Sequence, residues 1–149
     1  MPTDAAVLVI GDNGLEKESI AKAFQNAGFS NPVHVFKDIE EGKKYLQGHG
    51  LYADRKRFPL PRLALLDYHD PEPNGWELLR WMRSKSVSMN LPVVVFGASD
   101  GPVHEERVSE LAAAYHVKPQ KTEQYEELIR RIGEFWLIDY SRDGRPETA

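Results

Sequence analysis

Residues 63–67 read Leu-Ala-Leu-Leu-Asp, four apolar residues in a row that end in a carboxylate. An uninterrupted apolar run of this length is typical of a strand that is buried on both faces of a parallel sheet. Two further runs share this character, Ala-Ala-Val-Leu-Val-Ile at 5–10 and Leu-Pro-Val-Val-Val-Phe at 91–96. We therefore expect a parallel sheet that is covered by helices on both faces.

Segments with a helical spacing of apolar residues alternate with the strands along the chain. The pattern predicts five strands and five helices, an α/β fold with right-handed crossovers. Gly28 is the expected stop of the first helix, and Asp38 is the expected N-cap of the second. The expected strands are 5–10, 33–35, 63–66, 91–96 and 113–117, and the expected helices are 15–27, 38–48, 76–85, 100–111 and 123–137.

The composition is that of a soluble globular protein, with 149 residues of which 41% are hydrophobic and 28% charged. This length fits one domain, which we expect over 1–140, followed by a polar tail over 141–149. The formal net charge of −4 does not indicate a basic nucleic-acid-binding surface. The short run Arg55-Lys56-Arg57 is interpreted first as a solvated loop and second as a phosphate- or partner-binding segment. The chain has no cysteine, no apolar run long enough to cross a membrane and no signal peptide. We therefore expect a cytoplasmic protein without disulfides or cysteine-bound zinc.

The residues that can carry chemistry stand where the expected strands end. Asp12 follows the first strand, Asp67 ends the third, and Lys118 follows the fifth. In open parallel sheets, ligand sites form outside the carboxyl ends of the strands. We therefore expect two carboxylates and one ammonium to lie together at one edge of the sheet.

Four motifs at these strand ends resemble the receiver domain of two-component response regulators. They are VLVIGDN at 7–13, LALLDYHDPEPNG at 63–75, LPVVVFGAS at 91–99 and YHVKP at 115–119. The match runs from about Ala5 to Leu137, and the motifs occur in the order of the family. The resemblance implies a CheY-like, flavodoxin-like doubly wound sheet with strand order 2-1-3-4-5.

The resemblance also implies a role for each residue at this edge. Asp67 matches the aspartate that accepts a phosphoryl group from a histidine kinase. Asp12, Asp67 and the backbone carbonyl of His69 match the ligands of Mg²⁺, an ion that prefers oxygen donors. Lys118 matches the lysine that pairs with the carboxylate and then with the phosphoryl oxygens. Tyr115 matches the aromatic whose rotamer follows phosphorylation, although a static packing role fits it equally well.

Two positions depart from the family pattern. Gly11 stands where the family normally has the first of two acidic residues, which predicts weaker Mg²⁺ binding. Gly97 stands where the family has a Thr or Ser whose hydroxyl follows the phosphoryl group, which weakens the expected coupling to Tyr115. Ser99, two residues further on, is a hydroxyl that could substitute for it.

These residues are compatible with three functions. The first is a single-domain response regulator, phosphorylated on Asp67, which signals by protein contact because no output domain follows Leu137. Such a protein is not an enzyme beyond slow self-dephosphorylation. The second is a pseudo-receiver that works as an interaction module without phosphorylation, which Gly11 and Gly97 favour. The third is a phosphatase of the aspartyl-phosphate class, which needs Asp-x-Asp, whereas Asp70 lies one place too far.

The partners also follow from the resemblance. A histidine kinase is the expected donor, and the segment GLYADRKRFPLP at 50–61 resembles that of single-domain regulators that work beside phytochrome-type kinases. The expected output partner is a protein, with no nucleic acid and no membrane involved. A homodimer through the face of the fourth helix, fifth strand and fifth helix is a further expectation, and the apolar residues Trp136, Leu137 and Ile138 are consistent with it.

Overall fold

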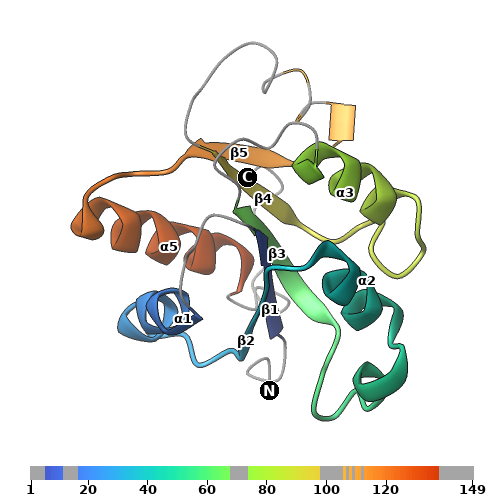
Figure 1. Ribbon diagram of the computed structural model, residues 1–149. Helices are drawn as coiled ribbons and strands as arrows, with labels where there is room; N and C mark the ends of the chain where they lie inside the picture. The colour runs from blue at the N-terminus through green and yellow to red at the C-terminus, as the bar shows by residue number, and fades with distance from the viewer. Residues whose placement is uncertain are drawn as a thin grey trace, which may run out of the picture.

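The chain folds around a five-stranded parallel sheet with the order β2-β1-β3-β4-β5 (Figure 1). This computed structural model describes residues 6–11, 17–67, 74–97, 106, 108, 110–111 and 113–137. All neighbouring strands run parallel, which confirms the predicted flavodoxin-like order 2-1-3-4-5. The strands are β1 (Ala6–Gly11), β2 (Val33–Phe36), β3 (Pro61–Asp67), β4 (Val93–Gly97) and β5 (Ala114–Val117).

Helices cover both faces of the sheet, with α1 and α5 on one face and α2 and α3 on the other (Figure 1). The described chain holds α1 (Lys17–Asn26), α2 (Ile39–Gln47), α3 (Asn74–Arg83), α5 (Thr122–Trp136) and a 3₁₀ helix, η2 (Gly50–Ala53). Four of the five predicted α-helices are therefore present in full among the described residues. The remaining one was expected at 100–111, where only Glu106, Val108, Glu110 and Leu111 are described, all of them helical. Among the described residues, no helix is both long and apolar enough to cross a bilayer.

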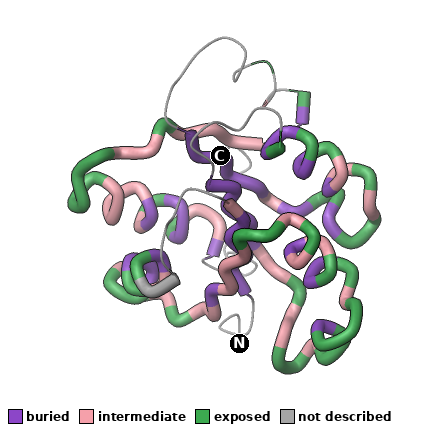
Figure 2. Tube along the Cα trace, viewed as in Figure 1, coloured by how far each residue is buried: buried purple, intermediate pink, exposed green. Residues whose placement is uncertain are grey.

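The apolar runs are buried because successive side chains of a strand point to opposite faces of the sheet. Strand residues of one parity form a core with α1 and α5: Val7, Val9, Leu63, Leu65, Val94 and Phe96. Those of the other parity form a core with α2 and α3: Leu8, Ile10, Ala64, Leu66, Val93 and Val95. Figure 2 shows the buried sheet at the centre and exposed residues on the outer sides of the helices. Asp67 ends β3 within this buried layer and is only 2% exposed.

The second helix has the two ends that the sequence predicted. The side chain of Asp38 accepts a hydrogen bond from the backbone N–H of Glu40 at 3.0 Å, which satisfies a free donor of the first turn. At the other end, Gly48 has φ 72°, a left-handed conformation that glycine adopts without strain. Its N–H donates to carbonyls of the last turn, so α2 is held at both ends.

The 49–61 loop folds back onto α2. Arg55 donates from Nη1 to the carbonyls of Tyr45 (2.9 Å) and Phe58 (3.1 Å), and from Nη2 to the carbonyl of Leu46 (3.0 Å). The guanidinium therefore donates hydrogen bonds to two carbonyls in the last turn of α2, those of Tyr45 and Leu46, which have no partner within the helix. The interpretation of Arg55 as a solvated loop residue is wrong, because loop closure turns its side chain inward.

Tyr45 is fully buried beneath this loop, and its burial makes the free energy of unfolding depend on pH in alkaline solution. Its hydroxyl donates to the carbonyl of Pro59 at 2.6 Å, and burial raises the pKa of Tyr45 from 10.0 to about 12. The folded state favours the neutral phenol, so the stability that depends on it is complete below pH 10 and is lost as the pH rises toward 12. The free energy of unfolding should fall by up to about 1.4 kcal/mol per pH unit in that interval. Urea titrations at alkaline pH should show a shallower slope in Tyr45→Phe, and equal slopes would contradict the assignment.

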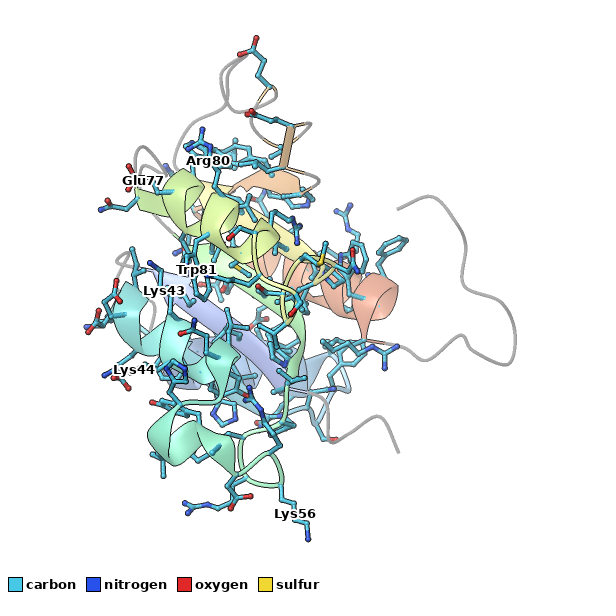
Figure 3. The ribbon with its side chains drawn as sticks, turned by 90° about the vertical axis from the view of Figure 1, so that its right-hand side faces the viewer. Lys43, Lys44, Lys56, Glu77, Arg80 and Trp81 are labelled. Carbon is cyan, nitrogen blue, oxygen red and sulfur yellow. The ribbon has the colours of Figure 1, made fainter. Side chains whose placement is uncertain are left out.

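Arg83, the last residue of α3, ties this helix to the turn before β4. Its guanidinium donates to the carbonyls of Leu111 (2.8 Å), Leu91 (2.7 Å), Ser88 and Met89 (both 3.3 Å). Because lysine lacks this fork of donors, Arg83→Lys should lower the free energy of unfolding by about 1–2 kcal/mol. Arg80→Lys, on the exposed side of the same helix (Figure 3), is the matched control and should change it by less than about 0.5 kcal/mol. Urea denaturation measures both, and equal losses would contradict the role of Arg83.

Candidate functional site

The carboxyl ends of four strands meet at one edge of the sheet. Gly11, which ends β1, lies opposite Asp67, which ends β3. Gly97, which ends β4, lies opposite Val117 of β5. The backbone N–H of Lys118 then donates to the carbonyl of Gly97 at 2.9 Å, which continues the pairing one residue beyond β5. The sheet itself therefore fixes where the Lys118 side chain begins relative to Asp67.

An ion pair joins the ends of β3 and β5. The Nζ atom of Lys118 lies 3.1 Å from Oδ2 and 3.4 Å from Oδ1 of Asp67. The Asp67 side chain is 2% exposed and that of Lys118 is 19% exposed, so the lysine is the more exposed member of the pair. A buried carboxylate needs such a partner because removing its charge from water is costly. The pair can present a carboxylate oxygen as a nucleophile beside a cation that stabilises added negative charge.

The structure brings together two of the three side chains predicted at this edge, Asp67 and Lys118. Asp12, the third, lies outside the described residues, as do His69 and Ser99. Among the described residues, no group of three or more His, Asp or Glu side chains could hold a metal ion. Asp67 nevertheless supplies the kind of oxygen donor that Mg²⁺ prefers, so the described part of the site fits this ion. The roles of these residues stay predictions.

Gly11 has a steric role at this edge in addition to its missing charge. The ends of β1 and β3 approach so closely that a β-carbon on residue 11 would overlap the backbone carbonyl oxygen of Asp67. A backbone atom in a paired strand cannot move aside as the tip of a side chain can. An acidic residue at position 11 therefore does not fit unless β1 and β3 move apart.

Tyr115 fills the space that a side chain on residue 97 would need. A β-carbon on Gly97 would overlap the hydroxyl of Tyr115, which therefore points inward toward β4. The half-buried ring of Tyr115 also lies 6.3 Å, between centroids, from the ring of the buried Trp76. In this structure Tyr115 packs where the family pattern has a hydroxyl side chain. Whether it also switches stays a prediction.

Gly97→Ser is expected to displace Tyr115 and to lower the free energy of unfolding by about 1 kcal/mol. The cost is modest because the overlapping atom is the tip of a side chain, which can turn away. In a Tyr115→Ala background the same serine meets no hydroxyl, so the double-mutant cycle should show coupling. Urea denaturation gives the four free energies, and tryptophan fluorescence, to which Trp76 beside Tyr115 contributes, reports a displacement of that ring. Additive effects of the two substitutions would contradict the overlap.

Tyr125 is a residue of this site that the sequence analysis did not identify. It lies near the start of α5, with its ring centroid 5.9 Å from Nζ of Lys118 and 6.5 Å from the ring of Phe96. Burial raises the pKa of Tyr125, and the negative charge of Asp67 raises it further, so the hydroxyl keeps its proton. Its only signal in the sequence is that it closely follows Lys118, since the docking of α5 decides which way the ring points.

Curated proteins with a similar sequence are regulators. The chain is 28% identical to the probable methanogenesis regulatory protein FilR2 of Methanothrix harundinacea, over 88% of this chain and 83% of that protein. It is 30% identical to the virulence transcriptional regulatory protein PhoP of Salmonella typhimurium over 85% of this chain, but it spans only 49% of that protein. No protein-family model matches the chain.

Similar solved structures are response regulators. RPA3017, a response regulator in red light signaling of R. palustris, has a TM-score of 0.78 at 28% identity, covering 97% of this chain and 99% of that one. The phosphorylated cyanobacterial phytochrome response regulator RcpA has a TM-score of 0.76 at 27% identity, covering 90% of this chain and 94% of that one. Both therefore share the fold over nearly their whole length.

Proposed function

Because this chain is a receiver domain of the two-component response-regulator family, we propose that Asp67 accepts a phosphoryl group from a histidine kinase. The observation that carries the proposal is the ion pair between Lys118 and the buried Asp67 carboxylate, 3.1 Å apart at the end of β3. The likeness to RcpA, which is a phosphorylated response regulator, supports the same assignment.

In the proposed reaction, an oxygen of the Asp67 carboxylate attacks the phosphorus of a phosphohistidine. The new O–P bond forms as the P–N bond breaks, and the departing imidazole takes up a proton. Lys118 lies beside the attacking carboxylate, where its ammonium can pair with oxygens of the arriving group. Attack of water on the acyl phosphate would later restore the carboxylate. The chain thus acts as a phosphoacceptor with slow self-dephosphorylation and not as an enzyme for an external substrate.

Mg²⁺ is the cofactor that we propose for this site, held by Asp12, Asp67 and the backbone carbonyl of His69. When bound, it supplies positive charge that offsets the negative charge of the transferring group. Because Gly11 leaves one carboxylate fewer than the family pattern, we expect weaker Mg²⁺ binding than in receiver domains with both acidic residues.

The proposed partners are a histidine kinase and a downstream protein, met in the cytoplasm. RPA3017 and RcpA are by their descriptions proteins of red light and phytochrome signalling, so a phytochrome-type kinase is the proposed donor. A homodimer through β5, α5 and the helix expected at 100–111 remains a proposal, which the partly exposed Trp136 supports. Ile138 and the tail expected at 141–149 lie outside the described residues.

Phosphorylation by a small donor tests the proposal without knowledge of the kinase. After incubation with acetyl phosphate and Mg²⁺, the intact mass of the wild type should rise by one phosphoryl group. Asp67→Asn should show no rise, whereas Asp54→Asn, in the exposed part of the 49–61 loop, should behave as the wild type does. No rise in the wild type, or an equal rise in Asp67→Asn, would overturn the proposal.

A phosphorylation-independent interaction module is the second candidate, and Gly97 favours it. Tyr115 already lies in the space above Gly97, so its inward position does not require a phosphoryl group. Beryllofluoride with Mg²⁺ mimics a phosphoryl group on a carboxylate and separates the two candidates. A change in tryptophan fluorescence that disappears in Asp67→Ala supports the regulator, and the absence of any change supports the interaction module.

A further inference from the structure

The buried hydroxyl of Tyr125 has no hydrogen-bond partner among the described residues. Buried hydroxyls are nearly always paired, because an unpaired one destabilises the fold. Two other tyrosines follow this rule: Tyr45 donates to the carbonyl of Pro59 at 2.6 Å, and Tyr52 donates to Glu41 at 2.7 Å. The hydroxyl of Tyr125, which lies beside the Asp67–Lys118 pair, does not follow this rule.

The contacts of Tyr125 place it at the rim of the site. Its ring lies 5.9 Å from Nζ of Lys118, so the ammonium that pairs with Asp67 also lies over an aromatic face. The same ring packs against Phe96, one residue before the end of β4. Tyr125 and Lys118 line a hollow of about 360 Å³ between α1 and the start of α5, to which α1 contributes Lys22.

The charge near this hydroxyl changes when Asp67 is phosphorylated. In the resting protein, the negative charge lies on the carboxylate and is paired with Lys118. In the phosphorylated protein, the phosphoryl oxygens extend beyond the carboxylate and carry additional negative charge. A buried hydrogen-bond donor, which is already shielded from water, forms a strong hydrogen bond with such a charged oxygen. The hydroxyl of Tyr125 can therefore form a stronger hydrogen bond in the phosphorylated state than in the resting state.

We propose that Tyr125 takes part in binding the phosphoryl group on Asp67, donating a hydrogen bond from its hydroxyl to a phosphoryl oxygen, directly or through one water. Its ring meanwhile supports the ammonium of Lys118. This inference rests on the proposed function and extends the site to a residue of α5. Because the bond forms only when Asp67 carries the group, it links the position of α5 to phosphorylation.

Tyr125→Phe separates the hydroxyl from the ring, since it removes the first and keeps the second. The probe is beryllofluoride in saturating Mg²⁺, with its affinity measured by titration calorimetry. The affinity should fall about five- to thirtyfold in Tyr125→Phe. Without the probe, the same variant should have a higher thermal midpoint than the wild type, because it lacks an unpaired buried hydroxyl.

Tyr45→Phe is the matched control. It removes the same atom from a buried tyrosine, but from one that is hydrogen-bonded to Pro59 and lies on the other face of the sheet. This variant should have a lower thermal midpoint and should bind the probe as the wild type does. Opposite shifts of the two midpoints are a result that a loss of packing alone would not produce.

Two results would overturn the inference and leave the proposed function standing. One is equal affinity for the probe in the wild type and Tyr125→Phe. The other is a lower affinity together with a lower thermal midpoint, which would assign Tyr125 a packing role only. If the wild type bound no probe, or if Asp67→Ala bound it equally well, the proposed function would fail and the inference would fail with it.

Discussion

Lys118→Met is expected to lower the free energy of unfolding by about 3 kcal/mol, whereas Asp67→Asn should lower it by less than about 1 kcal/mol. The difference follows from burial, since Asp67 is 2% exposed and Lys118 is 19% exposed. Without the lysine, the carboxylate stays buried and loses the ammonium that lay 3.1 Å away. Without the carboxylate, the flexible lysine can carry its ammonium into water.

A double-mutant cycle measures this asymmetry. Lys118→Met in an Asp67→Asn background should cost much less than Lys118→Met alone, because no buried charge remains to be compensated. Urea denaturation of the wild type, the two single variants and the double variant gives the four free energies. Equal and small losses for the single variants would contradict a buried charge at this edge of the sheet.

Gly11→Ala is expected to lower the free energy of unfolding by about 3 kcal/mol, at the upper end of what overpacking costs. The added β-carbon would overlap the carbonyl oxygen of Asp67, which is part of the paired strand β3. Gly97→Ala is the matched control, since it also adds one carbon at a strand end but meets only the tip of Tyr115. It should cost no more than about 1 kcal/mol. Urea denaturation compares the two, and equal costs would contradict the close approach of β1 and β3.

Gly11→Asp extends this prediction to the proposed Mg²⁺ cofactor. The substitution restores the acidic residue of the family pattern, so charge alone would predict tighter Mg²⁺ binding. Sterics predict the opposite, because the added side chain forces β3 and its Asp67 away from β1. Calorimetric titration with Mg²⁺ should show no gain in affinity over the wild type, and a clear gain would show that the strand ends can separate at little cost.

The strands could be predicted from sequence because each buried one carries an unbroken apolar run. The start of β3 could not, since Pro61 and Arg62 have no apolar signal. Pro61 joins the strand by pairing with Ala6 of β1, and Arg62 lies where the register shifts between Ala6 and Val7. Arg55 shows the same limit. Its basic neighbours suggested a solvated loop. The loop closes onto α2, however, and the guanidinium of Arg55 donates hydrogen bonds to three carbonyls.

The Asp67–Lys118 pair could be predicted because the ends of parallel strands share one edge, whatever the packing of the helices. Tyr125 could not, because its position depends on how α5 docks against Phe96 and Lys118. The role of Gly11 could be predicted from the sequence only in part. The sequence showed the missing charge, while the close approach to Asp67 is a property of the paired strands.

Borohydride trapping tests most directly whether Asp67 is the phosphoacceptor. Borohydride reduces an acyl phosphate to an alcohol and releases phosphate, so an aspartate that carried the group becomes homoserine. After incubation with acetyl phosphate and Mg²⁺, peptide mass spectrometry should find homoserine at position 67 and nowhere else, and only when the phosphodonor was present. An unmodified Asp67, or homoserine at another aspartate, would contradict the assignment.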